Sequence, residues 1–141
     1  MIPVKVAISG QPGTGKTRTV LRIAQMIEDK FQIGGFTTHP IEENGELIGY
    51  NLKDYVTGEE ELSASVRWDV KPKIPGRTPE ATPLGIRLDA VNRIATASVA
   101  KAIEEADLIL VDEVGKLVSE SKEFSVVLKE ALKCGKPMLI T

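Results

Sequence analysis

The hydrophobic pattern near the N-terminus is that of a strand, a helix and a second strand. Residues 4–8, VKVAI, are a short apolar run rich in β-branched side chains, which predicts a buried parallel strand. From Lys16 to about Lys30 the apolar residues recur every three or four positions, which predicts an amphipathic helix. Residues 34–39, GGFTTH, predict a second strand that is entered through two glycines. This alternation is typical of an α/β fold.

The middle of the chain changes to short strands and tight turns. Asn44-Gly45, the strongest short hairpin signal, separates two stretches of strand-like composition. A second turn at 57–60 precedes another such stretch, so we expect a small antiparallel β meander. Residues 70–83 hold four of the eight prolines and predict a long surface loop, a feature that is often functional. We expect the whole insert to span about residues 38–88.

The C-terminal part returns to helices and strands. Asp89 is a plausible N-cap for a helix whose apolar stripe follows it. Residues 107–115, DLILVDEVG, are the most hydrophobic run of the chain and end in two acids, which predicts a buried strand. Residues 122–135 predict a helix with Gly135 in the C′ position, and residues 136–141 predict a further strand.

Composition and charge exclude several classes of protein. The 141 residues are 42% hydrophobic and 27% charged with a formal net charge of −2, which argues against nucleic acid as the main partner. Cys134 is the single cysteine, so the chain supports neither an internal disulfide nor a cysteine metal cluster. No apolar run approaches the roughly 20 residues of a membrane span, and the N-terminus lacks a signal-peptide pattern. We expect a cytoplasmic protein that does not bind membranes.

The segment between the first strand and the first helix is a predicted phosphate-binding loop. It matches G-x-x-x-x-G-K-[ST] in the strand–loop–helix context that this motif requires. Glycines let successive backbone N–H groups turn inward at a helix N-terminus and bind phosphate. The lysine reaches the β- and γ-phosphates, and the hydroxyl residue binds Mg²⁺. The predicted nucleotide-binding residues are Gly10, Gln11, Pro12, Gly13, Thr14, Gly15, Lys16, Thr17 and Arg18.

The two acids after the most hydrophobic run are typical of the second element of such sites, the Walker B motif. There the aspartate, here Asp112, holds Mg²⁺ through a water and orients the hydroxyl of Thr17. Glu113 follows where a carboxylate can polarise the attacking water. We predict Thr17 and Asp112 as metal-binding residues, and Lys16 and Glu113 as catalytic residues. An ordinary acidic turn after a buried strand is the alternative interpretation of the two acids.

The order of these motifs predicts a three-layer P-loop NTPase fold with a mostly parallel sheet and a RecA-like strand order. In this acid-pair division of P-loop folds, an extra strand separates the phosphate-loop strand from the strand that carries the acids. Residues 137–141, PMLIT, are placed to form that strand, with Thr141 at its tip as a residue that senses the γ-phosphate. The D-x-x-G pattern of GTPases also fits Asp112–Gly115, but no guanine-reading N-K-x-D follows it.

Together the phosphate loop, GGFTT at 34–38 and LILVDEVGKL at 108–117 resemble the cancer-related nucleoside-triphosphatase family, which includes thermostable P-loop NTPases. The resemblance covers residues 3–141. It implies slow, Mg²⁺-dependent hydrolysis of ATP, GTP and other nucleoside triphosphates to the diphosphate and phosphate, with broad base tolerance. It also implies that the family's nucleotide and catalytic positions are matched by Gly13, Gly15, Lys16, Thr17, Asp112 and Glu113.

The chain departs from the family pattern at three places. His39-Pro40 stand where the family usually has an acid, and residues 84–87, LGIR, replace a glycine-aromatic segment. Family members also continue beyond the strand that ends at Thr141. We therefore expect a single domain over residues 1–141 from which the C-terminal part of the fold is missing.

Two other classes of function stay open from the sequence. A nucleotide or small-molecule kinase would use the meander and the proline-rich loop as acceptor site and lid. A nucleotide-dependent binding module would recruit a macromolecule, but no protein partner is identified by the sequence. Positive side chains that could reach the γ-phosphate, and aromatic ones that could stack on a base, are more simply surface or anchoring residues; they are Arg18, Arg67, Arg77, Arg87, Arg93, Lys116, Tyr50 and Trp68.

Overall fold

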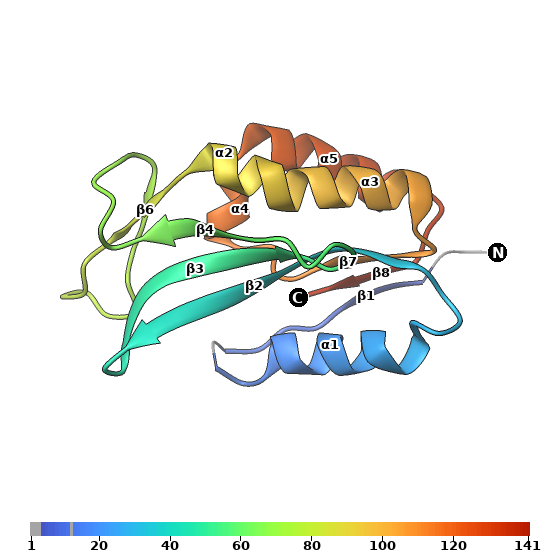
Figure 1. Cartoon of the computed structure of the whole chain (residues 1–141), viewed down its shortest axis with the longest axis horizontal. Helices are drawn as coiled ribbons and strands as arrows, with labels where there is room; N and C mark the ends of the chain where they lie inside the picture. The colour runs from blue at the N-terminus through green and yellow to red at the C-terminus, as the bar shows by residue number, and fades with distance from the viewer. Residues whose placement is uncertain (1–3, 12) are drawn as a thin grey trace.

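A computed structural model describes residues 4–11 and 13–141. Its centre is one twisted sheet in the order β1-β8-β7-β2-β3-β4-β6-β5 (Figure 1). The strands are β1 (Lys5–Ala7), β2 (Ile33–Glu43), β3 (Glu46–Asp54), β4 (Glu60–Ser65), β5 (Lys73–Ile74), β6 (Leu84–Ile86), β7 (Leu108–Val111) and β8 (Met138–Ile140).

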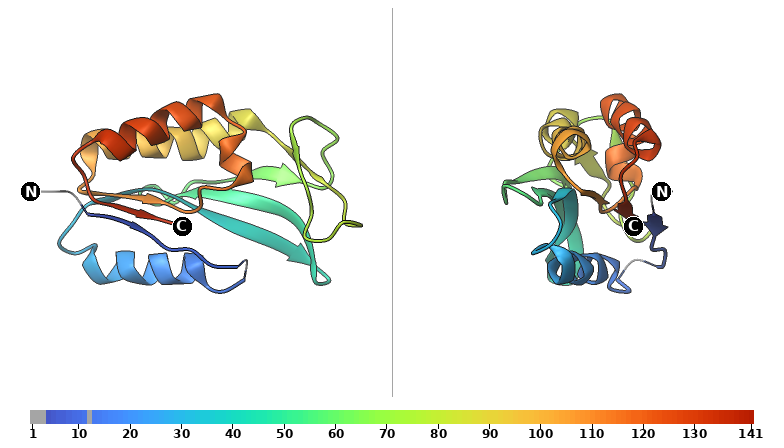
Figure 2. Two further views of the ribbon diagram at one scale, coloured as in Figure 1. Left: turned by 180° about the vertical axis from the view of Figure 1, so that it is seen from behind. Right: turned by 90° about the vertical axis from the view of Figure 1, so that its right-hand side faces the viewer.

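Helices cover both faces of the sheet, so the fold has three layers. Helix α1 lies alone on one face, and the remaining helices lie on the other (Figures 1 and 2). They are α1 (Lys16–Ile27), α2 (Leu88–Val91), the π-helical turn η1 (Asn92–Thr96), α3 (Ala97–Glu105), α4 (Lys116–Ser119) and α5 (Lys122–Lys133). Among the residues described here, none of the helices is both long and apolar enough to cross a membrane.

Strand β8 separates the phosphate-loop strand β1 from the acid-bearing strand β7, as predicted. The pairs β1–β8, β8–β7 and β7–β2 are parallel. Beyond β2 the pairing becomes antiparallel, because the meander extends the same sheet instead of forming a separate layer. Three of the seven strand pairs are parallel and four are antiparallel, and the antiparallel pairs are those of the predicted meander and the two short strands beside it. Strand β1 is parallel but exposed and not buried, because in the described part of the chain it lies at the sheet edge with β8 as its one neighbour.

The predicted hairpin joins β2 to β3. Asn44 and Gly45 have φ of 52° and 79°, the left-handed conformation that an Asn-Gly turn adopts most readily. The two strands are long, so the hairpin projects past the end of the parallel strands (Figure 1). Strands β5 and β6 were not predicted, because both are too short to show a strand pattern in the sequence. Strand β5 has two residues, and β6 has three, Leu84–Ile86, directly after the proline-rich loop.

The predicted helices differ from the observed ones at their ends, and neither the short helix α4 nor the π-helical turn η1 was predicted. The N-cap assignment of Asp89 is wrong, because α2 begins at Leu88 after Arg87 and Asp89 lies inside the first turn. Helix α5 is capped by Ser121, whose Oγ accepts a hydrogen bond from the Phe124 N–H at 3.0 Å. Gly135 follows the C-cap residue Cys134, in the C′ position that we predicted.

The core divides unevenly between the two faces of the sheet. The larger part lies under α2, α3 and α5, where Phe36 of β2 packs edge-on against Phe124 of α5 with ring centroids 5.7 Å apart. The smaller part lies under α1, where Val20 and Ala24 pack with Leu110 of β7. Because consecutive β7 residues point to opposite faces, its four apolar residues serve both parts.

Gly35 lets β2 and β7 come together. Its φ is +124°, and a Cβ there would lie 1.8 Å from the carbonyl oxygen of Leu110. An L-residue cannot adopt this position unless the two strands separate.

We predict that Gly35→Ala lowers the free energy of unfolding by at least about 3 kcal/mol, because strain and a backbone clash combine at one position. Gly58→Ala is the matched control, since Gly58 has φ of +75° with open space around its Cβ position. It should lose only about 1–2 kcal/mol from backbone strain. Urea unfolding of both variants measures the difference, and equal losses would contradict the proposed close approach.

Candidate functional site

The carboxyl ends of the parallel strands bring the predicted residues to one edge of the sheet. The phosphate loop follows β1, Thr141 follows β8, and Asp112 and Glu113 follow β7. Strand β2 runs on past this edge and carries Thr38 alongside the acids. This is the edge at which open α/β sheets bind ligands.

The loop before α1 has an anion-binding conformation. Gly13 and Gly15 have φ of +81° and +89°, with open space where a Cβ would stand. Gly15 is the N-cap of α1, and within the described residues no side chain caps this helix end. The first N–H groups of α1 are therefore free for an anion. Thr14 closes the loop by donating its hydroxyl proton to the Gln11 carbonyl at 2.7 Å. Pro12, also predicted here, lies outside the described residues.

Lys16 bends back over the loop. Its Nζ donates to the Gly10 carbonyl at 2.9 Å and lies 3.7 Å from Oε2 of Glu113. The Glu113 side chain is 45% exposed, so this ion pair is weak. A phosphate oxygen could replace both of these described contacts of the ammonium group. Arg18, one residue past Thr17, is exposed on the first turn of α1.

Asp112 is the buried centre of the site. Its residue exposure is 1%, and its Oδ1 accepts hydrogen bonds from the hydroxyls of Thr17 at 3.1 Å and Thr141 at 2.7 Å. The backbone N–H of Thr38 approaches its Oδ2 at 3.4 Å. Three donors from α1, β2 and the end of β8 thereby compensate the cost of burying a carboxylate.

Thr38 contacts both acids, a role that we did not predict. Its hydroxyl donates to the Asp112 carbonyl oxygen at 2.7 Å and accepts the Glu113 N–H at 3.2 Å. Part of the signal was present in the sequence, because GGFTT lies near the end of the second predicted strand and the two acids follow the most hydrophobic run. What could not be read from it is that the two strands are neighbours in the sheet.

A cavity of about 170 Å³ opens beside Glu113. Its walls come from Thr38, Tyr50, Ile74, Pro75, Gly115, Lys116 and Leu117. Burial raises the pKa of Tyr50, which the Arg77 guanidinium opposes and the Glu113 carboxylate reinforces. The meander and the proline-rich loop therefore reach the acid end of the site, and Tyr50 lies there and not on a separate base-stacking surface.

Lys116 lines the cavity beside Glu113, whereas three of the candidate arginines contact other side chains. Arg77 pairs with Glu42 of β2 at 2.6 Å. Arg93 forms ion pairs with Glu61 and Asp89. Arg87 lies 4.0 Å from the ring centroid of Trp68, a cation–π contact that accounts for both side chains.

The donors at the site suit Mg²⁺. Among the described residues no group of three or more His, Cys, Asp or Glu side chains could hold a metal. One carboxylate and one hydroxyl, from Asp112 and Thr17, are instead close together. Mg²⁺ is commonly bound by one or two carboxylates, with phosphate oxygens and water as the remaining ligands.

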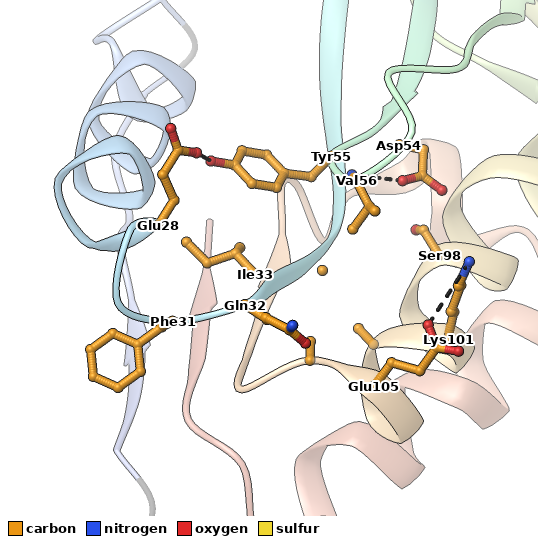
Figure 3. Close-up of a pocket in the computed structure, with 13 residues that line it drawn as sticks. Glu28, Phe31, Gln32, Ile33, Asp54, Tyr55, Val56, Ser98, Lys101 and Glu105 are labelled. Carbon is orange, nitrogen blue, oxygen red and sulfur yellow. Dashed lines mark hydrogen bonds and ion pairs between the residues drawn. The ribbon is translucent and has the colours of Figure 1, made fainter.

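A larger cavity of about 470 Å³ lies at the opposite end of the sheet (Figure 3). It opens between the end of α1, the start of β2 and α3. At the wall of this cavity the Tyr55 hydroxyl donates a hydrogen bond of 2.5 Å to the Glu28 carboxylate. Burial and this hydrogen bond raise the pKa of Tyr55 to about 12. None of the predicted site residues lines this cavity.

Comparisons with known proteins agree with this geometry. A sequence model of a family described as NTPase matches residues 5–141. The nucleoside-triphosphatase THEP1 of Methanocaldococcus jannaschii is 31% identical over 139 residues, which cover 98% of this chain and 77% of that protein. The nucleoside-triphosphatase THEP1 of Thermococcus kodakarensis is 34% identical over 140 residues, which cover 96% of this chain and 74% of that protein.

Two solved structures have the same fold. The crystal structure of THEP1 from the hyperthermophile Aquifex aeolicus matches with a TM-score of 0.80 at 22% identity, over 98% of this chain and 76% of that one. The solution structure of a human cancer-related nucleoside triphosphatase matches with a TM-score of 0.70 at 20% identity, over 100% of this chain and 75% of that one. The predicted α/β fold of the P-loop type is confirmed, and the chain belongs to the NTPase family.

Proposed function

We propose that this protein hydrolyses nucleoside triphosphates to the diphosphate and phosphate with the help of Mg²⁺. The observation that carries the proposal is the contact between Thr17 and Asp112, which joins the phosphate loop to the acid strand across 95 positions of sequence. An ordinary acidic turn after a buried strand would not be expected to place its carboxylate within hydrogen-bonding distance of the Thr17 hydroxyl.

Triphosphate binding is assigned to the loop and to Lys16. The N–H groups at the start of α1 hold the β- and γ-phosphates, and Lys16 turns from the Gly10 carbonyl to the phosphate oxygens. Thr17 and Asp112 would hold Mg²⁺, which neutralises charge on the phosphates when bound. Thr141, whose hydroxyl meets Asp112, is the residue assigned to sense the γ-phosphate.

Activation of the attacking water is assigned to Glu113. A carboxylate near the γ-phosphate can accept a proton from water as the water attacks phosphorus. The neighbouring cavity of about 170 Å³ has space for several water molecules, each of which occupies about 30 Å³ in the liquid. Space for water beside the acid favours hydrolysis over transfer to another acceptor, because an active site that transfers a group to another acceptor avoids hydrolysis by excluding water.

We extend the proposal to the substrate range. Hydrolysis is slow, as the resemblance to the family implies. It is also broad in base specificity, with ATP, GTP and other nucleoside triphosphates as substrates, because the contacts assigned above are all with the phosphates. The protein names of the relatives state nucleoside-triphosphatase without a preferred base, in agreement with this range.

Lys16→Ala should weaken the binding of a non-hydrolysable triphosphate by about 1.5–3 kcal/mol, the contribution of a charge-assisted hydrogen bond. This loss raises the Kd roughly 10- to 150-fold. Calorimetric titration measures it, with Lys129→Ala on the exposed surface of α5 as control. Equal Kd values for the two variants would exclude Lys16 from the phosphate site.

Asp112→Asn should raise the Mg²⁺ concentration for half-maximal turnover at least about tenfold, since an amide is a weaker ligand than a carboxylate and has one acceptor oxygen where the carboxylate accepts at both. Turnover is followed by phosphate release across a Mg²⁺ series, and chelation of the metal should stop it in the unsubstituted protein. A metal-independent rate would contradict the metal assignment.

Glu113→Gln should lower kcat at least about 100-fold with little change in nucleotide affinity, because the amide cannot take a proton from water. Phosphate release from ATP, GTP, CTP and UTP is the measurement, with Glu104→Gln on the exposed face of α3 as control. Tight binding of all four nucleotides without release by the unsubstituted protein would overturn hydrolysis in favour of a kinase or a nucleotide-dependent binding module.

A further inference from the structure

Among the residues that the structure describes, Thr38 is the one whose side chain hydrogen-bonds to the backbone of both acids. Its hydroxyl is held between the Asp112 carbonyl oxygen at 2.7 Å and the Glu113 N–H at 3.2 Å. A hydroxyl can donate one hydrogen bond and accept another, and both functions are used here. The residue is 7% exposed, so bulk water cannot easily substitute for either partner.

The strand that carries Thr38 is rigidly placed. Strand β2 is parallel to β7 up to the pair Phe36–Val111, and the Asp112 N–H then donates to the Phe36 carbonyl at 3.2 Å. On its other side Thr38 is paired with Leu52 of β3, a fully buried residue. A group on a strand with neighbours on both sides holds its position more accurately than a loop residue does.

Glu113 has no comparable support of its own. Its side chain is 45% exposed, and within residues 4–11 and 13–141 its carboxylate has one contact, the weak 3.7 Å ion pair with Lys16, for which a bound triphosphate would compete. The direction in which this carboxylate points is therefore set by its backbone, and the backbone N–H of Glu113 is held by Thr38.

We propose that Thr38 is a positioning residue that orients Glu113 for attack by water. The inference rests on the proposed hydrolysis. It separates two functions within Thr38: the hydroxyl positions the Glu113 backbone, whereas the backbone N–H of Thr38 approaches the Asp112 carboxylate at 3.4 Å. Replacement of the side chain removes the first function and leaves the second.

The test is Thr38→Val, which keeps the shape and β-branching of threonine and removes both hydroxyl hydrogen bonds. We expect kcat to fall about 10- to 100-fold, as for other groups that orient a functional side chain. The KM for the Mg²⁺-nucleotide and the Mg²⁺ half-saturation should change less than about threefold, because the phosphate loop and the Thr38 N–H are intact. Thr38→Ser retains the hydroxyl and should restore kcat.

Thr37→Val is the matched control. Thr37 is the preceding residue of the same strand, is 2% exposed, and directs its hydroxyl to Nε2 of His39 at 2.7 Å on the opposite face. It should lose comparable stability in urea unfolding but keep kcat. If Thr38→Val does not fold, Thr38→Ala removes the same hydroxyl without a new methyl group and takes its place.

A double variant separates positioning from a general loss of structure. If Thr38 acts through Glu113, Thr38→Val should lower the residual rate of Glu113→Gln less than about threefold. Full additivity, or a kcat for Thr38→Val equal to that of Thr37→Val, would overturn the inference. These results differ from failure of the proposed function, in which the unsubstituted protein does not release phosphate or Glu113→Gln keeps its rate.

Discussion

The burial of the Asp112 carboxylate is the constraint on which the site depends. A charge that is 1% exposed is tolerated only if hydrogen-bond donors replace the water that it has lost. Those donors are Thr17 from α1, Thr38 from β2 and Thr141 after β8. Burial of the Asp112 carboxylate therefore requires that α1, β2 and the end of β8 all adopt their native positions. Each donor also lies near the phosphate loop or near Glu113, and the same hydrogen bonds that stabilise the acid therefore assemble the reactive groups.

The mixed sheet determines what surrounds this centre. In the parallel part, β8 lies between β1 and β7, so the loop after β1 and the acids after β7 lie at the same edge of the sheet. Thr141, which follows β8, lies between them in this order and donates its hydroxyl proton to Asp112. In the antiparallel part the strands continue past that edge, so the meander forms a wall beside Glu113. One continuous sheet thus supplies both the groups that we assign to phosphate binding and the cavity next to them. Neither the parallel nor the antiparallel part would supply both the phosphate-loop residues and the cavity wall alone.

Much of this arrangement could be predicted, and the failures have physical causes. The glycine pattern, the lysine and the two acids act over a few residues, so their spacing alone indicates a phosphate loop and a metal-binding strand. The positions of β8 and of the Asn44-Gly45 hairpin were also predicted, the first from family order and the second from turn chemistry. Thr38 and Tyr50 could not be assigned, because their role depends on which strands are neighbours and how far each continues. The exposure of β1 likewise depends on its place at an edge, which its apolar sequence does not reveal.

The uneven core has a consequence for how firmly the layers hold together. Helix α1 is attached to the sheet through a small cluster in which it contributes two fully buried residues, Val20 and Ala24, whereas the opposite layer shares the large cluster around Phe36 and Phe124. Regions with few buried contacts open first in the native state, and their amide protons exchange soonest. Helix α1, whose N-terminus we assign to phosphate binding, is thus the least anchored layer of the described fold. A triphosphate bound by both α1 and the Asp112 end of β7 would connect the helix to the sheet, and its stabilising effect would grow with the logarithm of its concentration relative to its Kd.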